Sequence, residues 1–238
     1  MERAVGGGMD STDRFKGWLD CSYDEQLTNL NLPWLPWIGA GFREQKVRTV
    51  VLGESVYDYS KGDAAKRERI LHQDSLRTRH LNHAILAKFK SRYVRNFERA
   101  YFRKEKPTAQ ERQDLWGRVA YHNLVLRMLR ASRARPSDAD YANGWERFLE
   151  VARCLDAKQV VVYGLEQRKI NALRSLQSLH GRIQHLEITG AAGVKPVALS
   201  LANASGSCMR LLFIRHPSAF FRWEEWGKVV QQFCGEPA

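Results

Sequence analysis

Reactive side chains follow two short apolar runs near opposite ends of the chain. Residues 50–53 are a β-branched run closed by glycine and followed by Glu54, and residues 211–214 are an apolar run followed shortly by His216. A carboxylate could orient a water molecule, and an imidazole could donate a hydrogen bond to charge growing on a leaving group. The two segments therefore predict one site for acid–base chemistry, provided that the fold brings their ends together.

Each apolar run is typical of a buried parallel strand that ends in a polar loop. Open α/β sheets bind ligands at the carboxyl ends of such strands. Residues 160–163 form a third run, ending in Gly164, and residues 119–126 are a strand candidate that contains Asn123. A lone Asn in an apolar strand is costly to bury unless its amide has partners, so Asn123 is either a turn residue or a group held for a ligand.

Strands alternate with helical segments, which predicts a three-layer α/β/α fold with a mostly parallel central sheet. Helices are expected after a cap at Ser137 or Asp138, from Gly164 to about residue 179, and over 223–233. An aromatic-rich ordered loop is expected over residues 30–41, and a Gly/Ala/Pro loop before a last strand that starts near residue 209.

The domain organisation predicted from these patterns is simple. Residues 1–25 are expected to be a flexible N-terminal segment, because the chain begins Gly-rich and without periodicity. Residues 26–238 are expected to form a single α/β domain with a basic helical insertion at about 60–115.

Charge points to a polyanionic partner. The 238 residues include 38 Lys and Arg against 26 Asp and Glu, a net charge of +12, and residues 61–106 alone hold 14 basic and five acidic side chains. DNA is the first candidate partner and an anionic membrane surface the second. A solvated helix face would also be basic, but so large an excess of one sign favours a nucleic-acid surface.

Metal and redox chemistry have weak sequence support. The four cysteines contain no CxxC pair, which argues against a zinc ribbon and a disulfide scaffold and favours reduced thiols. The three-residue spacing of His80 and His83 suits a metal, yet without an acidic or cysteine partner we favour a surface or DNA-backbone position. No signal peptide or membrane-length apolar run is evident, so a cytoplasmic protein without membrane contact is expected.

Three motifs in this order resemble the uracil-DNA glycosylase superfamily: Gly53-Glu54-Ser55-Val56-Tyr57, then Asn123, then His216-Pro217-Ser218. Members of that family carry a first motif of the GQDPY or GEAPG type and a second of the HPS type. The segment from Asn123 through Arg135-Pro136 to Gly164 is also similar to the thermostable branch. The resemblance implies a uracil-DNA glycosylase-like fold acting on DNA as a monomer.

The resemblance also implies roles for individual residues. Glu54 would orient water near the anomeric carbon, and His216 would donate a hydrogen bond to the O2 atom of a pyrimidine base. Asn123 would read the base edge, while Tyr57, Tyr121 and Trp116 remain alternatives for stacking on it. The expected phosphate or DNA contacts are Ser55, Ser218, Arg215, Arg92 and Arg95, and the expected wedge is Phe220 or Phe221.

Departures from the family affect the expected substrate and cofactor. Ser55-Val56 replaces the Asp-Pro of GQDPY, so water activation moves to Glu54 or to Asp58. The cysteine spacing does not match the iron–sulfur pattern of the thermostable branch, and we predict no cofactor and no metal. Because the basic insertion is longer than usual, uracil and a modified, bulky cytosine of viral DNA, such as a glucosylated hydroxymethylcytosine, are both open as substrates.

The predicted function is a monofunctional DNA glycosylase that leaves an abasic site, in repair or in antiviral defence. The alternative is a catalytically inactive nucleic-acid-binding protein on the same fold. Singly, Glu54 could cap the next segment and His216 could be a satisfied core histidine. Their joint occurrence after two strands of a basic protein favours the enzyme. A phosphotransfer enzyme ranks last, because no GxxxxGK[ST] or GxGxxG loop is present.

Overall fold

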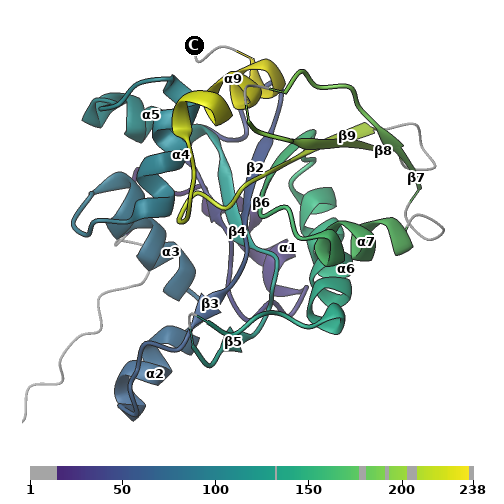
Figure 1. Cartoon of the computed structure of the whole chain (residues 1–238). Coiled ribbons are helices and arrows are strands. Elements are labelled where there is room, and N and C mark those ends of the chain that lie inside the picture. Colours follow the sequence, from purple (N-terminus) through teal and green to yellow (C-terminus); the bar gives the residue numbers. More distant parts are fainter. Residues whose placement is uncertain (1–14, 132, 177–180, 191–192, 203–207, 236–238) are drawn as a thin grey trace, which may run out of the picture.

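The computed structural model describes residues 15–131, 133–176, 181–190, 193–202 and 208–235. Its central sheet is built from the strands β1 (Trp37–Ile38), β2 (Thr49–Gly53), β4 (Ala120–Asn123), β6 (Gln159–Tyr163), β7 (Arg182–His185), β8 (Val197–Ala202) and β9 (Cys208–Ile214). Within the described residues the strand order is β1-β4-β2-β6-β9-β8-β7 (Figure 1). The four central strands β4, β2, β6 and β9 are parallel, and the outer strands pair antiparallel.

Helices cover both faces of this sheet. One layer contains α1 (Asp24–Thr28), α6 (Asp138–Cys154) and α7 (Gln167–Ser175), and the other contains α3 (Ser75–His80), α4 (Arg92–Phe102), α5 (Ala109–Arg118) and α9 (Trp223–Cys234). Successive strand residues face opposite layers, since Val50 and Leu52 pack with α6 and α7 whereas Val51 packs with α4 and α9. A mixed α/β fold with a mostly parallel central sheet flanked by helices is thereby confirmed.

Capping side chains fix where two of these helices begin. Ser137 caps α6, because its Oγ accepts from the backbone N–H of Asp140 at 3.2 Å while the Asp140 carboxylate accepts from the backbone N–H of Ser137. Thr108 and Glu111 form the same reciprocal pair at α5. Of the two predicted cap residues, Ser137 and Asp138, the helix is therefore capped by Ser137.

Several sequence expectations are corrected by long-range strand pairing. The strand candidate at 119–126 ends at Asn123. Two strands lie where loops were expected: β1 lies inside the expected aromatic loop and pairs with β4, and β8 lies inside the expected Gly/Ala/Pro loop and pairs with β7 and β9. The helix expected to about residue 179 ends at Ser175, and residues 177–180 lie outside the described residues.

The N-terminal boundary is also different from the expected one. Phe15 and Leu19 are buried, and Leu19 forms a bridge with Gly39. Asp24 accepts two hydrogen bonds from Arg77, at 2.6 and 3.0 Å. Residues 15–25 are therefore part of the folded domain, because they supply apolar surface and an ion pair to it, whereas the rest of the predicted flexible segment lies outside the described residues.

The basic insertion is helical, as predicted. It consists of α2 (Ala64–Leu71), α3, a π-helical turn η3 (Leu81–Ile85), α4 and α5. A small parallel pair, β3 (Val56–Tyr57) with β5 (Met128–Leu129), lies beside it. Not all of its charge faces solvent: Arg77 is buried against Asp24, and Arg95 pairs with the buried Glu98. Part of the basic excess therefore holds the insertion in place.

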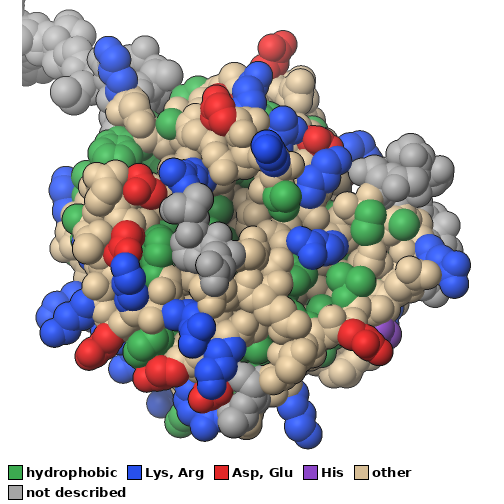
Figure 2. Space-filling model, turned by 90° about the horizontal axis from the view of Figure 1, so that it is seen from above, with side chains coloured by type: hydrophobic (Ala, Val, Ile, Leu, Met, Phe, Trp, Pro, Cys, Tyr) green, Lys and Arg blue, Asp and Glu red, His purple; other side chains and the backbone are tan. Residues whose placement is uncertain are grey.

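The surface carries charge of both signs. Figure 2 shows Lys and Arg side chains spread over the face seen from above, with Asp and Glu side chains between them. In the part of the chain that the structure describes, no helix has the length and apolar character needed to cross a membrane.

Candidate active site

The topology creates a crevice between β2 and β6. After β2 the chain crosses to β4 through the insertion on one face of the sheet. After β6 it passes through α7 on the other face and reaches β9 by way of β7 and β8. Adjacent parallel strands whose connections leave in opposite directions open a ligand crevice at their carboxyl ends. Glu54 follows β2 directly, and Gly164, Leu165 and Glu166 follow β6.

A cavity of about 740 Å³ occupies this crevice and brings most of the predicted site residues together. Its lining includes Glu54, Ser55, Tyr57, Tyr121, Asn123, Arg215, His216, Ser218 and Phe220. Most of these residues lie at or near the ends of β2, β4 and β9, and Tyr57 lies in β3, so the two distant polar loops of the sequence do share one site. Arg79, Tyr93, Arg135 and Glu166 also line the cavity and were not predicted.

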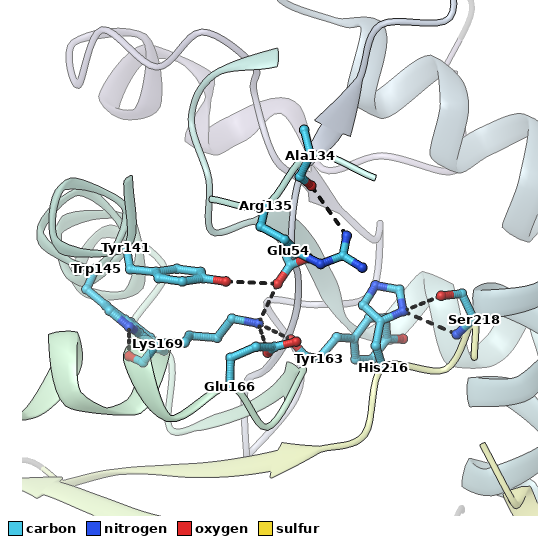
Figure 3. A network of polar contacts seen from close by, with 10 residues as sticks. All are labelled: Glu54, Ala134, Arg135, Tyr141, Trp145, Tyr163, Glu166, Lys169, His216 and Ser218. Atoms are coloured by element: carbon cyan, nitrogen blue, oxygen red, sulfur yellow. Dashed lines mark hydrogen bonds and ion pairs between the residues drawn. The ribbon is translucent and has the colours of Figure 1, made fainter. Parts of the chain in front are cut away.

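Glu54 is 9% exposed, and one of its carboxylate oxygens accepts two hydrogen bonds. Its Oε1 accepts from Nζ of Lys169 at 3.0 Å and from Oη of Tyr141 at 3.2 Å (Figure 3). Its other oxygen, Oε2, has no hydrogen-bond partner among the described residues. The carboxylate therefore has one occupied oxygen and one that a water molecule or a substrate in the cavity can use.

Lys169 is the main site residue that sequence reasoning missed. It is 0% exposed, and its ammonium also donates to Oε2 of Glu166 at 2.9 Å and to the carbonyl oxygen of Tyr163 at 2.7 Å. Burial has the largest single effect and opposes ionisation of Glu166, but the charge and the hydrogen bond of Lys169, with smaller contributions from a backbone hydrogen bond and His216, together lower the pKa of Glu166. The three-residue spacing of Glu166 and Lys169 could have suggested a helical ion pair. No pattern in the neighbouring sequence indicates that Lys169 also bonds to Glu54.

His216 is fixed in one tautomer by its own loop. Its Nδ1 accepts the backbone N–H of Ser218 at 3.2 Å and lies 2.8 Å from the hydroxyl of the same residue. Since a backbone N–H can only donate, Nδ1 carries no proton, and the neutral ring carries its proton on Nε2. Burial lowers the pKa of His216; the charges of Glu54 and Lys169 act in opposite directions on it. His216 is therefore a neutral donor at pH 7.

Asn123 is the last residue of β4 and is buried, with its Oδ1 accepting from Oη of Tyr121 at 3.1 Å. It is therefore not a turn residue. Gly53 on the neighbouring strand allows this arrangement, because a Cβ there would collide with Asn123 Oδ1 and Tyr121 Oη. Trp116 is fully buried with its Nε1 bonded to Glu98, so of the three aromatic candidates only Tyr57 and Tyr121 line the cavity.

His80 does not lie where the sequence suggested. It is 1% exposed, and its ring stacks on Tyr121 at 4.7 Å and contacts Trp116 and Trp37. Burial lowers its pKa to about 3. The surface or DNA-backbone position expected for His80 is therefore wrong, because the ring fills the aromatic core behind Tyr121. Among the described residues, no group of three or more His, Cys, Asp or Glu side chains could hold a metal ion.

The two candidate wedge residues have different environments. Phe220 is 89% exposed at the rim of the cavity and has a positive φ of 50°. Phe221 stacks on Trp226, with ring centroids 5.9 Å apart and planes at 9°. Of the pair, only Phe220 projects from the surface, and its unusual backbone geometry for a non-glycine residue is a feature of functional loops.

A second cleft of about 870 Å³ adjoins the first and shares Arg215, Ser218 and Phe220 with it. Arg92 and Asn96 of α4 also line this cleft and donate to the carbonyl oxygens of Ser218 and Pro217, at 3.4 and 2.7 Å. The insertion therefore supports the loop that carries His216.

The remaining predicted DNA contacts are less favourably placed. The guanidinium of Arg95 bonds to the Glu98 carboxylate and to the carbonyl oxygen of His83. Ser55 lines the cavity, but its Oγ is buried without a partner among the described residues. These two side chains are therefore not proposed as phosphate contacts, although the backbone of Ser55 remains available for that role.

No protein-family model matches the chain, and no curated protein is significantly similar to it. The function must therefore be argued from the chemistry of the site.

Proposed function

We propose that this protein is a monofunctional DNA glycosylase, which hydrolyses the N-glycosidic bond of a flipped-out pyrimidine base in DNA and leaves an abasic site. One observation carries the proposal: a carboxylate with a free oxygen, on Glu54, and a neutral imidazole donor, on His216, line the same cavity at the carboxyl ends of parallel strands. The motif resemblance to uracil-DNA glycosylases, which includes the same two residues, also supports it.

The chemistry requires one group for the sugar and one for the base. Cleavage of the bond gives the sugar positive, oxocarbenium character and the departing base negative charge. Oε2 of Glu54 would orient the attacking water and stabilise the positive sugar. The Nε2–H of His216 would donate to O2 of the base as charge grows there, and a donor fixed in advance needs no reorganisation during the reaction.

The walls of the cavity suit a planar base. Asn123 would contact the base edge with its amide, which the hydrogen bond from Tyr121 holds in one orientation. Tyr57 and Tyr121 would flank the base as apolar surfaces with polar tips.

The adjoining cleft suits the DNA strand on either side of the flipped nucleotide. It is lined by Arg92, Lys195, Arg215 and Arg222, which would contact backbone phosphates. An enzyme that acts on a base inside a duplex must extrude it against the free-energy cost of unstacking. Phe220, exposed between the two clefts, would fill the gap left in the stack.

The size of the cavity leaves room for a base larger than uracil. At about 740 Å³ it falls within the range of about 300–1,000 Å³ typical of sites for drug-sized ligands. The insertion contributes Leu76, Arg79 and Tyr93 to the wall. The substrate we propose is thus either uracil, in repair, or a modified and bulky cytosine of viral DNA, such as a glucosylated hydroxymethylcytosine, in defence.

The test is base release from a panel of DNAs containing uracil, other deaminated bases, and hydroxymethylated or glucosylated cytosine, followed by mass spectrometry. We expect one free base from wild type, none from Glu54→Gln, and wild-type release from Glu146→Gln, which changes an exposed acid on α6. Tight DNA binding without release from any DNA would instead support the inactive binding protein.

A further inference from the structure

The buried ammonium of Lys169 takes no direct part in the proposed reaction. Each of its three N–H groups has an acceptor: Glu54, Glu166 and the carbonyl oxygen of Tyr163. Burying a charge is costly, and a buried ion pair often stabilises a fold no better than apolar residues of the same size. A lysine is therefore not what stability alone would favour at this position.

Two helices of one layer aim donors at the same carboxylate oxygen. Tyr141 of α6 and Lys169 of α7 both bond to Oε1 of Glu54. The backbone of Lys169 is itself anchored, because Nε1 of Trp145 donates to its carbonyl oxygen at 2.8 Å (Figure 3). With Oε1 held from two directions, the carboxylate cannot rotate freely, and Oε2 keeps one orientation.

The charges around Glu54 are close to balanced, with the carboxylates of Glu54 and Glu166 against the ammonium of Lys169 and the guanidinium of Arg135. An ammonium paired with Glu54 alone would cancel its charge, but Glu166 provides a second carboxylate on the same ammonium. The other groups that face this cluster are the neutral His216, the hydroxyl of Tyr141 and the guanidinium of Arg135. A sugar with positive character would therefore meet a carboxylate that shares its neighbouring ammonium with a second carboxylate.

We infer that Lys169 and Tyr141 are positioning residues, which hold Oε1 of Glu54 so that Oε2 is fixed against the anomeric carbon and its attacking water. This inference rests on the proposed function. The two residues touch neither the substrate nor the water, and they act through Glu54 alone.

The experiment compares Lys169→Met and Tyr141→Phe with Lys228→Met, which removes an exposed ammonium that pairs with Glu225 on α9. Single-turnover base release and DNA affinity are measured across pH, together with thermal stability. We expect release to slow roughly 100-fold in Lys169→Met, as for a misplaced catalytic group, and roughly 10-fold in Tyr141→Phe, as for one lost hydrogen bond to a charge. DNA affinity should not change.

The pH profile separates positioning from a purely structural role. Without the ammonium the charge beside the reacting groups changes, so the pH profile of release by Lys169→Met should differ from that of wild type, whereas a purely structural loss would leave the profile unchanged. Unchanged rates and profiles in both variants would overturn the inference and leave the proposed function intact. Variants that only lose thermal stability, while their folded fraction works normally, would overturn it as well.

A second readout serves if the wild type releases no base, an outcome that removes the proposed function. Urea unfolding of Glu54→Gln, Lys169→Met and the double variant then measures the coupling between the two side chains. Coupling would show that Lys169 does hold Glu54, whereas additive effects would overturn that contact.

Discussion

Phe220 and Phe221 are neighbours in sequence, yet they have different roles in the proposed reaction. Phe221 is part of the packing through its stack on Trp226, whereas Phe220 contributes little to the core because it is 89% exposed. An exposed aromatic ring contributes little to the stability of the fold, but it would be stabilised by stacking between DNA bases. The proposed wedge is therefore Phe220.

Phe220→Ala should slow base release from duplex DNA by roughly 10-fold or more, because base–aromatic stacking is worth about 1–3 kcal/mol. Release from single-stranded DNA should change much less, since no stack has to be opened. Phe221→Ala is the matched control and should lower thermal stability instead. Equal slowing on both kinds of DNA would argue against a wedge.

The neutral tautomer of His216 can be observed directly. Because Nδ1 accepts the Ser218 N–H and burial lowers the pKa of the ring, we expect Nε2 to carry the proton at pH 7 and the ring to titrate below its usual value of 6.5. Nitrogen-15 NMR of labelled histidine, with His216→Asn for assignment, measures both. A ring protonated on both nitrogens at pH 7 would contradict the proposed donor role.

Helix α4 connects the insertion to the site. Asn96 and Arg92 bond to the loop that carries His216, and Phe97 and Val94 on the same helix are buried beneath them. The insertion is therefore both a part of the cavity wall and a support for the second polar loop. The surface that we propose for DNA binding begins where α4 meets the second cleft.

Arg92→Gln should weaken DNA binding in a salt-dependent way. One lost phosphate contact should reduce the slope of log affinity against log salt by roughly 1. Arg147→Gln, an exposed arginine of α6 that pairs with Glu150, is the control and should leave the slope unchanged. An identical slope for wild type and Arg92→Gln would place the DNA backbone elsewhere.

Two buried histidines make the free energy of unfolding of the protein depend on pH. Burial lowers the pKa of His80 to about 3 and that of His122 to about 4, from a usual value of 6.5. Their ring nitrogens have no partners among the described residues. Above pH 6.5 they are neutral in both folded and unfolded chains. Below it, only the unfolded chain takes up the protons, so stability is lost as the pH falls.

We expect the free energy of unfolding to fall by about 1.4 kcal/mol per pH unit for each histidine between pH 6.5 and the folded values. His80→Phe keeps a ring among Trp37, Trp116 and Tyr121 and should remove about half of this dependence. Urea unfolding at pH 7 and pH 5 measures it. A pH dependence that is the same in wild type and His80→Phe would mean that His80 is not buried as a neutral ring.

Features that depend on neighbouring residues could be predicted from the amino-acid sequence. Apolar runs closed by small or polar residues predicted β2, β6 and β9 and located Glu54 and His216 at strand ends. Capping residues predicted the start of α6, and helical periodicity predicted the insertion. These signals are local, since strand and helix formation and the position of a loop after a strand depend on a few adjacent side chains.

Features that depend on segments far apart in the chain became visible in the folded structure. The pairing of β8 with β9 turned an expected loop into a strand, and the packing of α6 and α7 on one face brought Tyr141 and Lys169 to Glu54. Burial likewise separated Phe220 from Phe221. Partners 87 and 115 residues from Glu54 leave no local signal, because a side chain's own sequence neighbours do not specify which distant residue satisfies it.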